Sequence, residues 1–205
     1  MPKRKPIPDP TLPRICMYVR VLESHQEANI SSAAIAEAAG VNAAQVRKDL
    51  SFFGQFGQPG VGYDVGELQV ALKRMLGLDR ERNVIIVGAG ALGSALIGYP
   101  GFEGRGFRIV GIFDSNPAKV GHRLRGYPVL PIDELPEQLA ALSAQLGVIA
   151  VPQAAAQSVA DTLVEAGMTA ILNFAPVSLR VPDSVALRNV DLTQHLECLA
   201  YYLED

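Results

Sequence analysis

Tryptophan is absent from this chain of 205 residues, and cysteine and histidine are scarce, with two and three residues. Cys16 and Cys198 lie far apart and make no metal-binding spacing, so we expect two free thiols in a reducing compartment and no metal site. No apolar run approaches the roughly 18 residues that a membrane span needs. The basic N-terminus also lacks the apolar segment of a signal peptide. These absences argue against a secreted or membrane protein and favour a cytoplasmic one.

Charged residues are also few, at 19%, whereas apolar residues make up 49% of the chain and can supply a large buried core. The charge is uneven. Residues 1–78 hold nine Lys and Arg against seven Asp and Glu, and residues 79–205 hold nine against fourteen. The slightly basic first part permits a nucleic-acid partner without requiring one. A chain of this length has room for two small domains.

Three short helices are predicted near the N-terminus, after a proline-rich basic arm. Five prolines within residues 1–13 predict that this arm is extended. The helices are expected over residues 14–26, 30–40 and 41–54. Their predicted caps and stops are Ser31 or Ser32, Gly40, Asn42 and Gly54. The glycine-rich residues 54–68 then predict a small hairpin or wing, and a linking helix is expected over residues 65–78.

The third predicted helix has two different faces. Its apolar face, which would pack on the preceding helices, consists of Ala43, Val46, Leu50 and Phe53. The opposite face is basic and polar, as in the second helix of a helix–turn–helix unit, which enters the DNA major groove. The residues that we expect to contact DNA are Ala44, Gln45, Arg47, Lys48 and Ser51. The alternative is a solvated charged face on an ordinary three-helix domain, and the wing that follows favours DNA.

From residue 83 onward, apolar strands alternate with helices. The strand-like segments are residues 83–88, 107–114, 127–131, 146–152 and 169–174. This alternation predicts a parallel sheet covered on both faces, which is a doubly wound, Rossmann-type α/β fold. We therefore expect a winged-helix DNA-binding domain over residues 1–78 and a dinucleotide-binding domain over residues 79–190.

The first of these strands runs into the pattern G-x-G-x-x-G, made by Gly88, Gly90 and Gly93. Glycines at this spacing allow a tight turn, close approach of a pyrophosphate and close helix–strand packing. Asp114 ends the next strand. It can accept a hydrogen bond from a ribose 2′-hydroxyl and would repel a 2′-phosphate, so NAD⁺ and NADH are favoured over the NADP forms. Together with two residues after a later strand, the predicted cofactor-binding residues are Gly88, Ala89, Gly90, Ala91, Leu92, Gly93, Asp114, Val151 and Pro152.

A catalytic set is missing beside this motif. A dehydrogenase needs a substrate site and an acid–base residue near the nicotinamide, but a dinucleotide-binding domain alone would fill the second part of the chain. His25, His122 and His195 form no catalytic pair, and Lys119 is the only lysine after residue 83. We therefore predict that the nucleotide is sensed and that the protein is not an enzyme. The alternatives are a small NAD-dependent oxidoreductase with a helical N-terminal extension and a nucleotide-binding interaction module.

Residues 191–205 predict a terminal helix with Asp191 as its N-cap. An apolar stripe runs along it through Leu192, Leu196, Leu199 and Leu203. This stripe would either contact a second subunit or cover the helix's own sheet, and we expect the dimer contact.

Several segments of the chain resemble the Rex family of redox-sensing transcriptional repressors. The residues that carry the resemblance are "ISSAAIAEAAGVNAAQVRKDLSFFGQFGQPGVGYDV", "VIIVGAGALGSAL", "GIFDSNPAKVG", "IAVPQAAAQ", "ILNFAPVSLRVP" and "NVDLTQHLECLAYYL". The resemblance implies a homodimer that binds a palindromic operator when NAD⁺ predominates and releases it when NADH binds.

The resemblance also implies roles for single residues. Tyr99, Asp191 and Arg14 match family positions that couple the cofactor to the DNA-binding domain. One departure from the family concerns the wing, where Gln58 and Pro59 stand in place of the basic residues that members commonly carry. This departure argues against phosphate contacts by the wing, for which the basic residues 3–5 of the arm could compensate.

Overall fold

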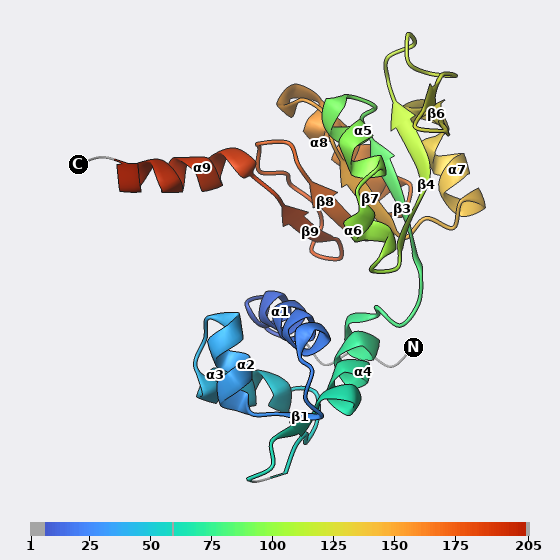
Figure 1. Ribbon diagram of the computed structural model, residues 1–205. Coiled ribbons are helices and arrows are strands. Elements are labelled where there is room, and N and C mark those ends of the chain that lie inside the picture. The colour runs from blue at the N-terminus through green and yellow to red at the C-terminus, as the bar shows by residue number, and fades with distance from the viewer. Residues whose placement is uncertain (1–6, 59, 204–205) are drawn as a thin grey trace. The chain divides into compact units, whose positions relative to one another are not determined.

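The computed structural model describes residues 7–58 and 60–203 and divides into two compact units, residues 1–80 and 81–205 (Figure 1). The predictions made for the basic residues 3–5 and for Pro59 lie outside the described residues. Each unit contains its own cluster or clusters of buried apolar side chains, so each unit has an apolar core of its own.

Within its described residues, the first unit consists of four helices and a short antiparallel pair of strands. The helices are α1 (Thr11–Ser24), α2 (Ser32–Ala39), α3 (Ala43–Ser51) and α4 (Val65–Leu76). Strand β1 (Asn29–Ile30) pairs with β2 (Tyr63–Asp64). A bridge between Gln58 and Gly62 closes the loop that precedes β2. The helix–turn–helix is therefore α2 and α3, and the predicted wing is the loop between α3 and β2.

Side-chain caps set the limits of the two helices in the helix–turn–helix. The Ser31 hydroxyl accepts from the Ala34 N–H at 3.1 Å, and the Asn42 carbonyl oxygen accepts from the Gln45 N–H at 2.8 Å. Gly40 ends α2 with φ 66°, a left-handed conformation that costs glycine little. These caps confirm the predicted starts of both helices. Helix α3 ends earlier than predicted, at Ser51 rather than at Gly54.

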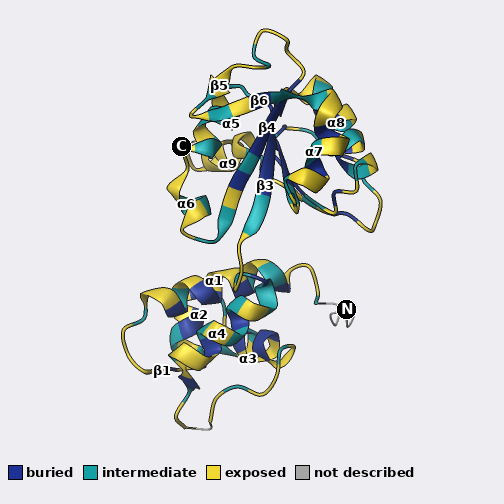
Figure 2. Cartoon of the chain, turned by 90° about the vertical axis from the view of Figure 1, so that its right-hand side faces the viewer, coloured by how far each residue is buried: buried dark blue, intermediate teal, exposed yellow. Residues whose placement is uncertain are grey.

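The prediction that the extended arm reaches residue 13 was wrong. Helix α1 begins at Thr11 and includes Pro13 in its first turn, where the N–H that proline lacks has no partner within the helix. The apolar face of α1 packs against α2, α3 and α4, and Figure 2 shows the buried residues of these helices in dark blue. The side chains at the centre of this core are Ile15, Tyr18, Leu22, Ile35, Val46, Leu50, Leu68 and Leu72.

The second unit is built on a seven-stranded sheet in the order β5-β6-β4-β3-β7-β8-β9. The strands are β3 (Arg82–Val87), β4 (Phe107–Asp114), β5 (Arg123–Leu124), β6 (Tyr127–Pro131), β7 (Leu146–Ile149), β8 (Ala170–Asn173) and β9 (Ala186–Asn189). All neighbouring pairs are parallel except β5 and β6. The chain leaves β3 toward β4 and β6 and later returns to its other side at β7, so the strand order reverses beside β3.

Helices cover both faces of this sheet, because successive apolar residues of a strand point to opposite faces. Val84 and Ile86 lie in one cluster with side chains of α5 (Ala91–Ile97) and α6 (Pro100–Glu103). Ile85 and Val87 lie in the other cluster, against α7 (Leu135–Ala141) and α8 (Gln153–Glu165). Figure 2 shows the dark strands between these helix layers.

The sheet ends in two short edge strands, and the last α-helix follows one of them. The edge strands β5 and β9 were missed from the sequence because they are short and partly exposed. Helix α9 (Leu192–Ala200) starts at Asp191, whose carboxylate accepts from the Thr193 and Gln194 N–H groups. No residue of α9 is buried, and the helix projects from the sheet (Figure 1). The alternative that it covers its own sheet is therefore wrong.

Candidate nucleotide and DNA-binding sites

The three motif glycines occupy different environments in the turn between β3 and α5. Gly88 has φ 111°, and a Cβ there would overlap the carbonyl oxygen of Ala150. A Cβ on Gly93 would overlap the carbonyl oxygen of Gly88. Gly90 has extended backbone angles, and a Cβ on it would meet no atom within 4 Å. The fold thus requires glycine at positions 88 and 93, whereas at Gly90 the space stays open for a ligand.

Gly90 is also the N-cap of α5, and as a glycine it supplies no side-chain cap. The N–H groups of the first helical turn therefore face this open side, which is a suitable environment for an anionic group such as a pyrophosphate. The cradle fits the diphosphate of a dinucleotide.

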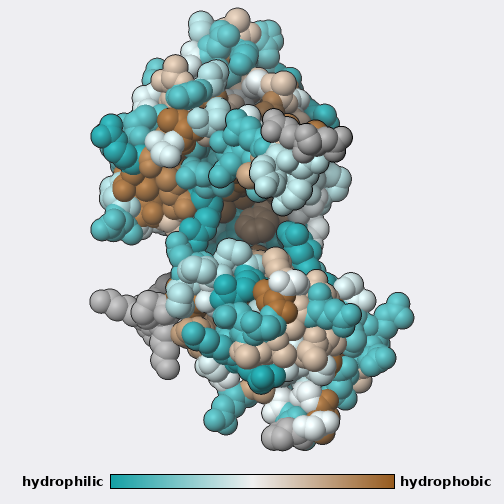
Figure 3. All heavy atoms as spheres, turned by 90° about the vertical axis from the view of Figure 1, so that its left-hand side faces the viewer, coloured by the Kyte–Doolittle hydropathy of each residue, from teal (hydrophilic) through white to brown (hydrophobic). Residues whose placement is uncertain are grey.

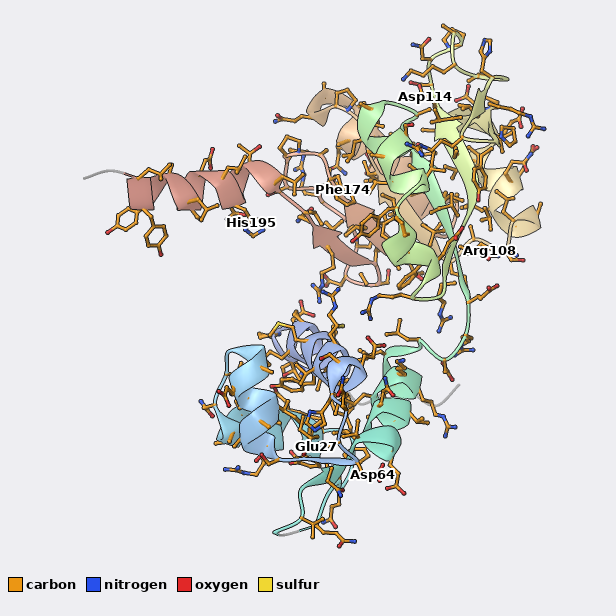
Figure 4. All side chains as sticks on the ribbon, in the orientation of Figure 1. Glu27, Asp64, Arg108, Asp114, Phe174 and His195 are labelled. Carbon is orange, nitrogen blue, oxygen red and sulfur yellow. The ribbon has the colours of Figure 1, made fainter. Side chains whose placement is uncertain are left out.

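Asp114 lies at the carboxyl end of β4 (Figure 4) and is 8% exposed. Its Oδ2 accepts from the Ala89 N–H at 2.8 Å and from Lys119 Nζ at 3.0 Å, and its Oδ1 accepts from the Asn116 N–H at 2.8 Å. Burial opposes ionisation, but the hydrogen bonds from Asn116, Lys119 and Ala89 hold the pKa of Asp114 below its ordinary value. Since an ionised carboxylate has about four acceptor positions, Oδ1 retains one for a hydroxyl group.

A pocket of about 350 Å³ opens beside Asp114, at the carboxyl ends of β3, β4 and β7. Open α/β sheets bind ligands at this edge, where the strand order reverses. Of the nine predicted cofactor residues, those that line the pocket are Gly88, Gly90, Asp114, Val151 and Pro152. Ala89, Ala91, Leu92 and Gly93 belong to the adjoining turn and first helical turn but do not line it.

Sequence reasoning missed the remaining walls of this pocket. They are Val87, Ser115, Lys119, Ile132, Ala150, Ala155, Ser158, Val159 and Thr162. Four of them lie on α8 at positions 155, 158, 159 and 162, a helical spacing that indicates one face. That spacing was readable in the sequence, but only the sheet shows that this face points to the carboxyl ends of the strands.

Helix α3 exposes a continuous polar surface. Ala44, Arg47, Lys48 and Ser51 are exposed, and Arg47 Nη1 donates to the Ser32 hydroxyl at 3.0 Å. The Ser51 hydroxyl donates to the Lys48 carbonyl oxygen. Four of the five residues predicted to contact DNA therefore share one accessible face, next to the N-terminus of α2.

The fifth residue, Gln45, is placed differently. Its side chain turns toward the core of the unit, where Gln45 Nε2 donates to Asp49 Oδ1 at 2.7 Å. Asp49 is buried and accepts two further hydrogen bonds from Arg14, with Nε at 2.6 Å and Nη2 at 2.8 Å. Tyr18 donates to the same carboxylate at 2.9 Å. Sequence reasoning missed Asp49, although a carboxylate between Val46 and Leu50 on a short helix signals a buried partner.

This environment shifts three pKa values, of which that of Arg14 is raised by its hydrogen bond to Asp49. Burial disfavours the charged carboxylate, but the hydrogen bonds from Arg14, Gln45 and Tyr18 outweigh it and lower the pKa of Asp49. Burial and the hydrogen bond to Asp49 raise the pKa of Tyr18 to about 12. Asp49 is thus ionised and Tyr18 is a neutral donor at neutral pH.

The three predicted coupling residues fall in both units. Arg14 pairs with Asp49 in the first unit. Tyr99 is the N-cap residue of α6, is 56% exposed and packs edge-to-face on Phe102. Asp191 caps α9. Their joint role remains a prediction.

The described residues contain neither a metal-binding cluster nor a membrane-spanning helix. Within residues 7–58 and 60–203, no group of three or more His, Cys, Asp or Glu side chains could hold a metal ion. None of the helices in that part of the chain has both the length and the apolar character needed to cross a lipid bilayer.

A helix–turn–helix unit joined to a Rossmann-type sheet with a glycine-turn pocket defines the class of two-domain transcription regulators with a nucleotide-binding module. Family models match both parts: "CoA binding domain" over residues 79–177 and "Putative DNA-binding protein N-terminus" over residues 6–51. The chain is 51% identical to the redox-sensing transcriptional repressor Rex of Carboxydothermus hydrogenoformans, with 95% of each chain covered. The Rex protein of Streptomyces coelicolor is 46% identical, covering 96% of this chain and 77% of that one.

Solved structures agree with these relatives. The crystal structure of RSP in complex with NAD⁺ and operator DNA has a TM-score of 0.90 and 41% identity, covering 97% of this chain and 93% of that one. The complex of RSP with NADH has a TM-score of 0.85 and 39% identity, covering 97% and 95%. The chain belongs to the Rex family of redox-sensing transcriptional repressors. The family resemblance and the winged-helix and Rossmann-type folds predicted from the sequence are confirmed.

Proposed function

We propose that this protein is a homodimeric repressor that binds palindromic operator DNA through α3, senses the NADH/NAD⁺ ratio, and leaves the operator when NADH binds. The observation that carries the proposal is the presence, in one chain, of an exposed basic α3 and a glycine-turn pocket with an open side at Gly90. Relatives named as redox-sensing repressors support it, as does RSP, which was crystallised with both coenzymes and with operator DNA. Such a protein acts in the cytoplasm of a bacterial cell.

The preference for NAD⁺ and NADH follows from Asp114. Its Oδ1 has one acceptor position left for a ribose hydroxyl, and its negative charge repels a 2′-phosphate. Lys119 offsets part of this charge, since its ammonium lies 3.0 Å from Oδ2. Coenzyme A shares the adenosine diphosphate of NAD⁺, so the match to a CoA-binding model is compatible with this pocket.

The protein senses the coenzyme and does not consume it. The titratable side chains that line the pocket, Asp114 and Lys119, already pair with each other, and Asp114 is the residue proposed to bind the adenosine ribose. NAD⁺ and NADH differ by one positive charge, and an apolar nicotinamide site would favour the neutral reduced ring. The loops after β7 and β8 provide such surroundings, since Val151 and Phe174 (Phe174 is labelled in Figure 4) pack against apolar clusters of the sheet and Pro152 follows Val151.

Coenzyme binding moves the two subunits of the dimer relative to each other. A ligand shifts a protein only through its different affinities for two conformations, and a near-complete switch requires roughly 5.5 kcal/mol. The NADH-bound arrangement would move the two α3 helices away from the roughly 34–36 Å spacing of successive major grooves. Tyr99, Asp191 and Arg14 are the proposed residues that couple this movement to the coenzyme.

The experiment that tests the proposal is fluorescence anisotropy of the labelled RSP operator with the purified protein, titrated separately with NAD⁺, NADH, NADPH and coenzyme A. We expect NADH to release the DNA and NAD⁺ to leave it bound. NADPH and coenzyme A should act only at higher concentrations. DNA binding that is indifferent to saturating NADH would contradict the sensor. Catalytic consumption of NADH with a small substrate would instead favour the oxidoreductase.

Helix α9 supplies the dimer contact. Leu192, Leu196 and Leu199 of α9, and Leu203 of the 3-10 helix Tyr201–Leu203 that follows it, are 59–83% exposed, and apolar stripes of this kind mark protein interfaces. The surface seen from the side where α9 projects also carries a hydrophobic patch on the Rossmann unit (Figure 3). A second copy of the chain would cover both.

A Leu196→Asp substitution should therefore convert the protein to a monomer without loss of fold, because Leu196 packs on no core of its own chain. The measurement is analytical ultracentrifugation together with a thermal melt. Gln194→Glu is the matched control, since it adds a charge on the other side of α9 near its N-terminus, where a negative charge is tolerated. A Leu196→Asp protein that remained dimeric would refute this role of α9.

A further inference from the structure

A buried carboxylate in the helix–turn–helix unit links the recognition helix α3 to α1. The Asp49 side chain is 1% exposed. It accepts four hydrogen bonds, from Arg14 Nε and Nη2, from the Tyr18 hydroxyl and from Gln45 Nε2. Arg14 Nη2 also donates to the Thr11 hydroxyl at 3.2 Å, which holds the guanidinium on α1. Four donors fill the roughly four acceptor positions of a carboxylate, so this network is complete.

The network constrains the rotation of α3 about its own axis. A bidentate arginine–carboxylate pair has a narrow preferred geometry. The two helices that carry this pair, α1 and α3, share one apolar core. Apolar contacts through Val46 and Leu50 hold α3 against the unit but tolerate sliding, whereas the ion pair does not. The pairing of Asp49 with Arg14 therefore sets the rotation of α3 about its axis, and with it the direction in which the face with Ala44, Arg47 and Lys48 points.

Gln45 makes the connection to DNA more direct. It lies in the first turn of α3, and residues in that part of a recognition helix contact base edges. Its amide nitrogen is held by Asp49 at 2.7 Å, so the placement of the side chain depends on that carboxylate. Base contacts require correct direction and distance, whereas phosphate contacts through long basic side chains tolerate small rotations.

On the basis of the proposed function, we propose that Asp49 is a positioning residue which sets the discrimination between operator and unrelated DNA, without itself contacting DNA. Arg14, Tyr18 and Gln45 act through it. Loss of the carboxylate would loosen α3 and displace Gln45, so specific binding should fall while nonspecific binding is retained.

The test measures the affinity of the full-length Asp49→Asn protein for the RSP operator and for a scrambled duplex of the same length, over a series of salt concentrations. We expect operator affinity to fall by about tenfold or more, whereas affinity for the scrambled duplex changes by less than about threefold and its salt dependence is unchanged. Removal of a negative charge alone would strengthen DNA binding. Glu37→Gln, an exposed acid on α2, controls for that effect.

Tyr18→Phe provides a second variant, which keeps both charges and the buried ring and removes one hydrogen bond. It should lower the ratio of operator affinity to scrambled-duplex affinity by about fivefold. If a thermal melt shows that the Asp49→Asn protein is unfolded, Tyr18→Phe alone tests the positioning role. A folded variant with the parent's ratio, or with equal losses on both duplexes, would overturn the positioning role. A parent protein that fails to prefer the operator would instead overturn the proposed function.

Discussion

A Gly93→Ala variant should lose about 1–3 kcal/mol or more of its free energy of unfolding. The added Cβ would overlap the carbonyl oxygen of Gly88, which belongs to the backbone of the turn and cannot move without disturbing β3 or α5. The buried location of Gly93 in α5 leaves no other direction for the methyl group. Chemical denaturation followed by circular dichroism measures the loss.

Gly90→Ala should have the opposite effects, with little change in stability and a loss of NADH affinity. Its backbone angles, φ −88° and ψ −166°, suit any residue, and its Cβ would meet nothing within 4 Å. We therefore expect the stability to stay within about 0.5 kcal/mol of the parent. NADH affinity should fall by about tenfold to hundredfold, because the methyl group occupies space proposed for the pyrophosphate.

Isothermal titration with NADH, combined with the denaturation series, distinguishes the two glycines. Gly104→Ala is the control, since Gly104 has φ −61°, is exposed and lies outside the pocket. It should change neither quantity. A Gly90→Ala protein that binds NADH as tightly as the parent would show that the pyrophosphate lies elsewhere.

The second large effect is expected on the affinity of the protein for operator DNA. Arg47→Ala should weaken binding to the operator by about 1–3 kcal/mol, which is roughly fivefold to 150-fold. The stability should hardly change, because Arg47 is exposed and its hydrogen bond goes to the surface hydroxyl of Ser32. Lys48→Ala should weaken binding to operator and scrambled duplexes alike and reduce the salt slope by about 1 if Lys48 contacts a phosphate.

Anisotropy titrations with both duplexes at several salt concentrations provide the measurement. Arg74→Ala removes the same charge as Arg47→Ala from an exposed site on α4 of the same unit, and it should leave operator affinity within about twofold of the parent. Equal effects of the Arg47 and Arg74 substitutions would mean that α3 does not read the operator and that only net charge matters.

Much of the local structure was predictable because its causes are local. Ser31, Asn42 and Gly40 limit α2 and α3 through hydrogen bonds and backbone angles within four residues of each cap. The apolar strand before Gly88 and the aspartate that ends the next strand likewise predicted the glycine turn and its acidic partner. Where a residue's partner is distant, prediction failed: the pairing of Asp49 with Arg14, 35 residues away, was missed.

In the nucleotide pocket, too, local features were predicted and contacts between distant segments were not. Its glycine turn was recognised from the glycine spacing together with the strand before it and the aspartate that ends the next strand. Lys119 and the α8 wall were not recognised, because their relation to Asp114 depends on how the sheet and its helices assemble. Strands β5 and β9 were missed for a similar reason, since a strand of two to four partly exposed residues is stable only through its neighbour.

By itself, the amino-acid sequence determined the two-part organisation, the caps of α2 and α3, the glycine turn and the basic face of α3, since each depends on side-chain periodicity or on hydrogen bonds between near neighbours. Tertiary structure alone decided that Asp49 is buried against Arg14 and Tyr18, that Asp114 already holds Ala89 and Lys119, and that the leucine stripe of α9 stays uncovered. These features arise where segments distant in the sequence meet, and the free energy of such contacts depends on burial and geometry that no local pattern contains.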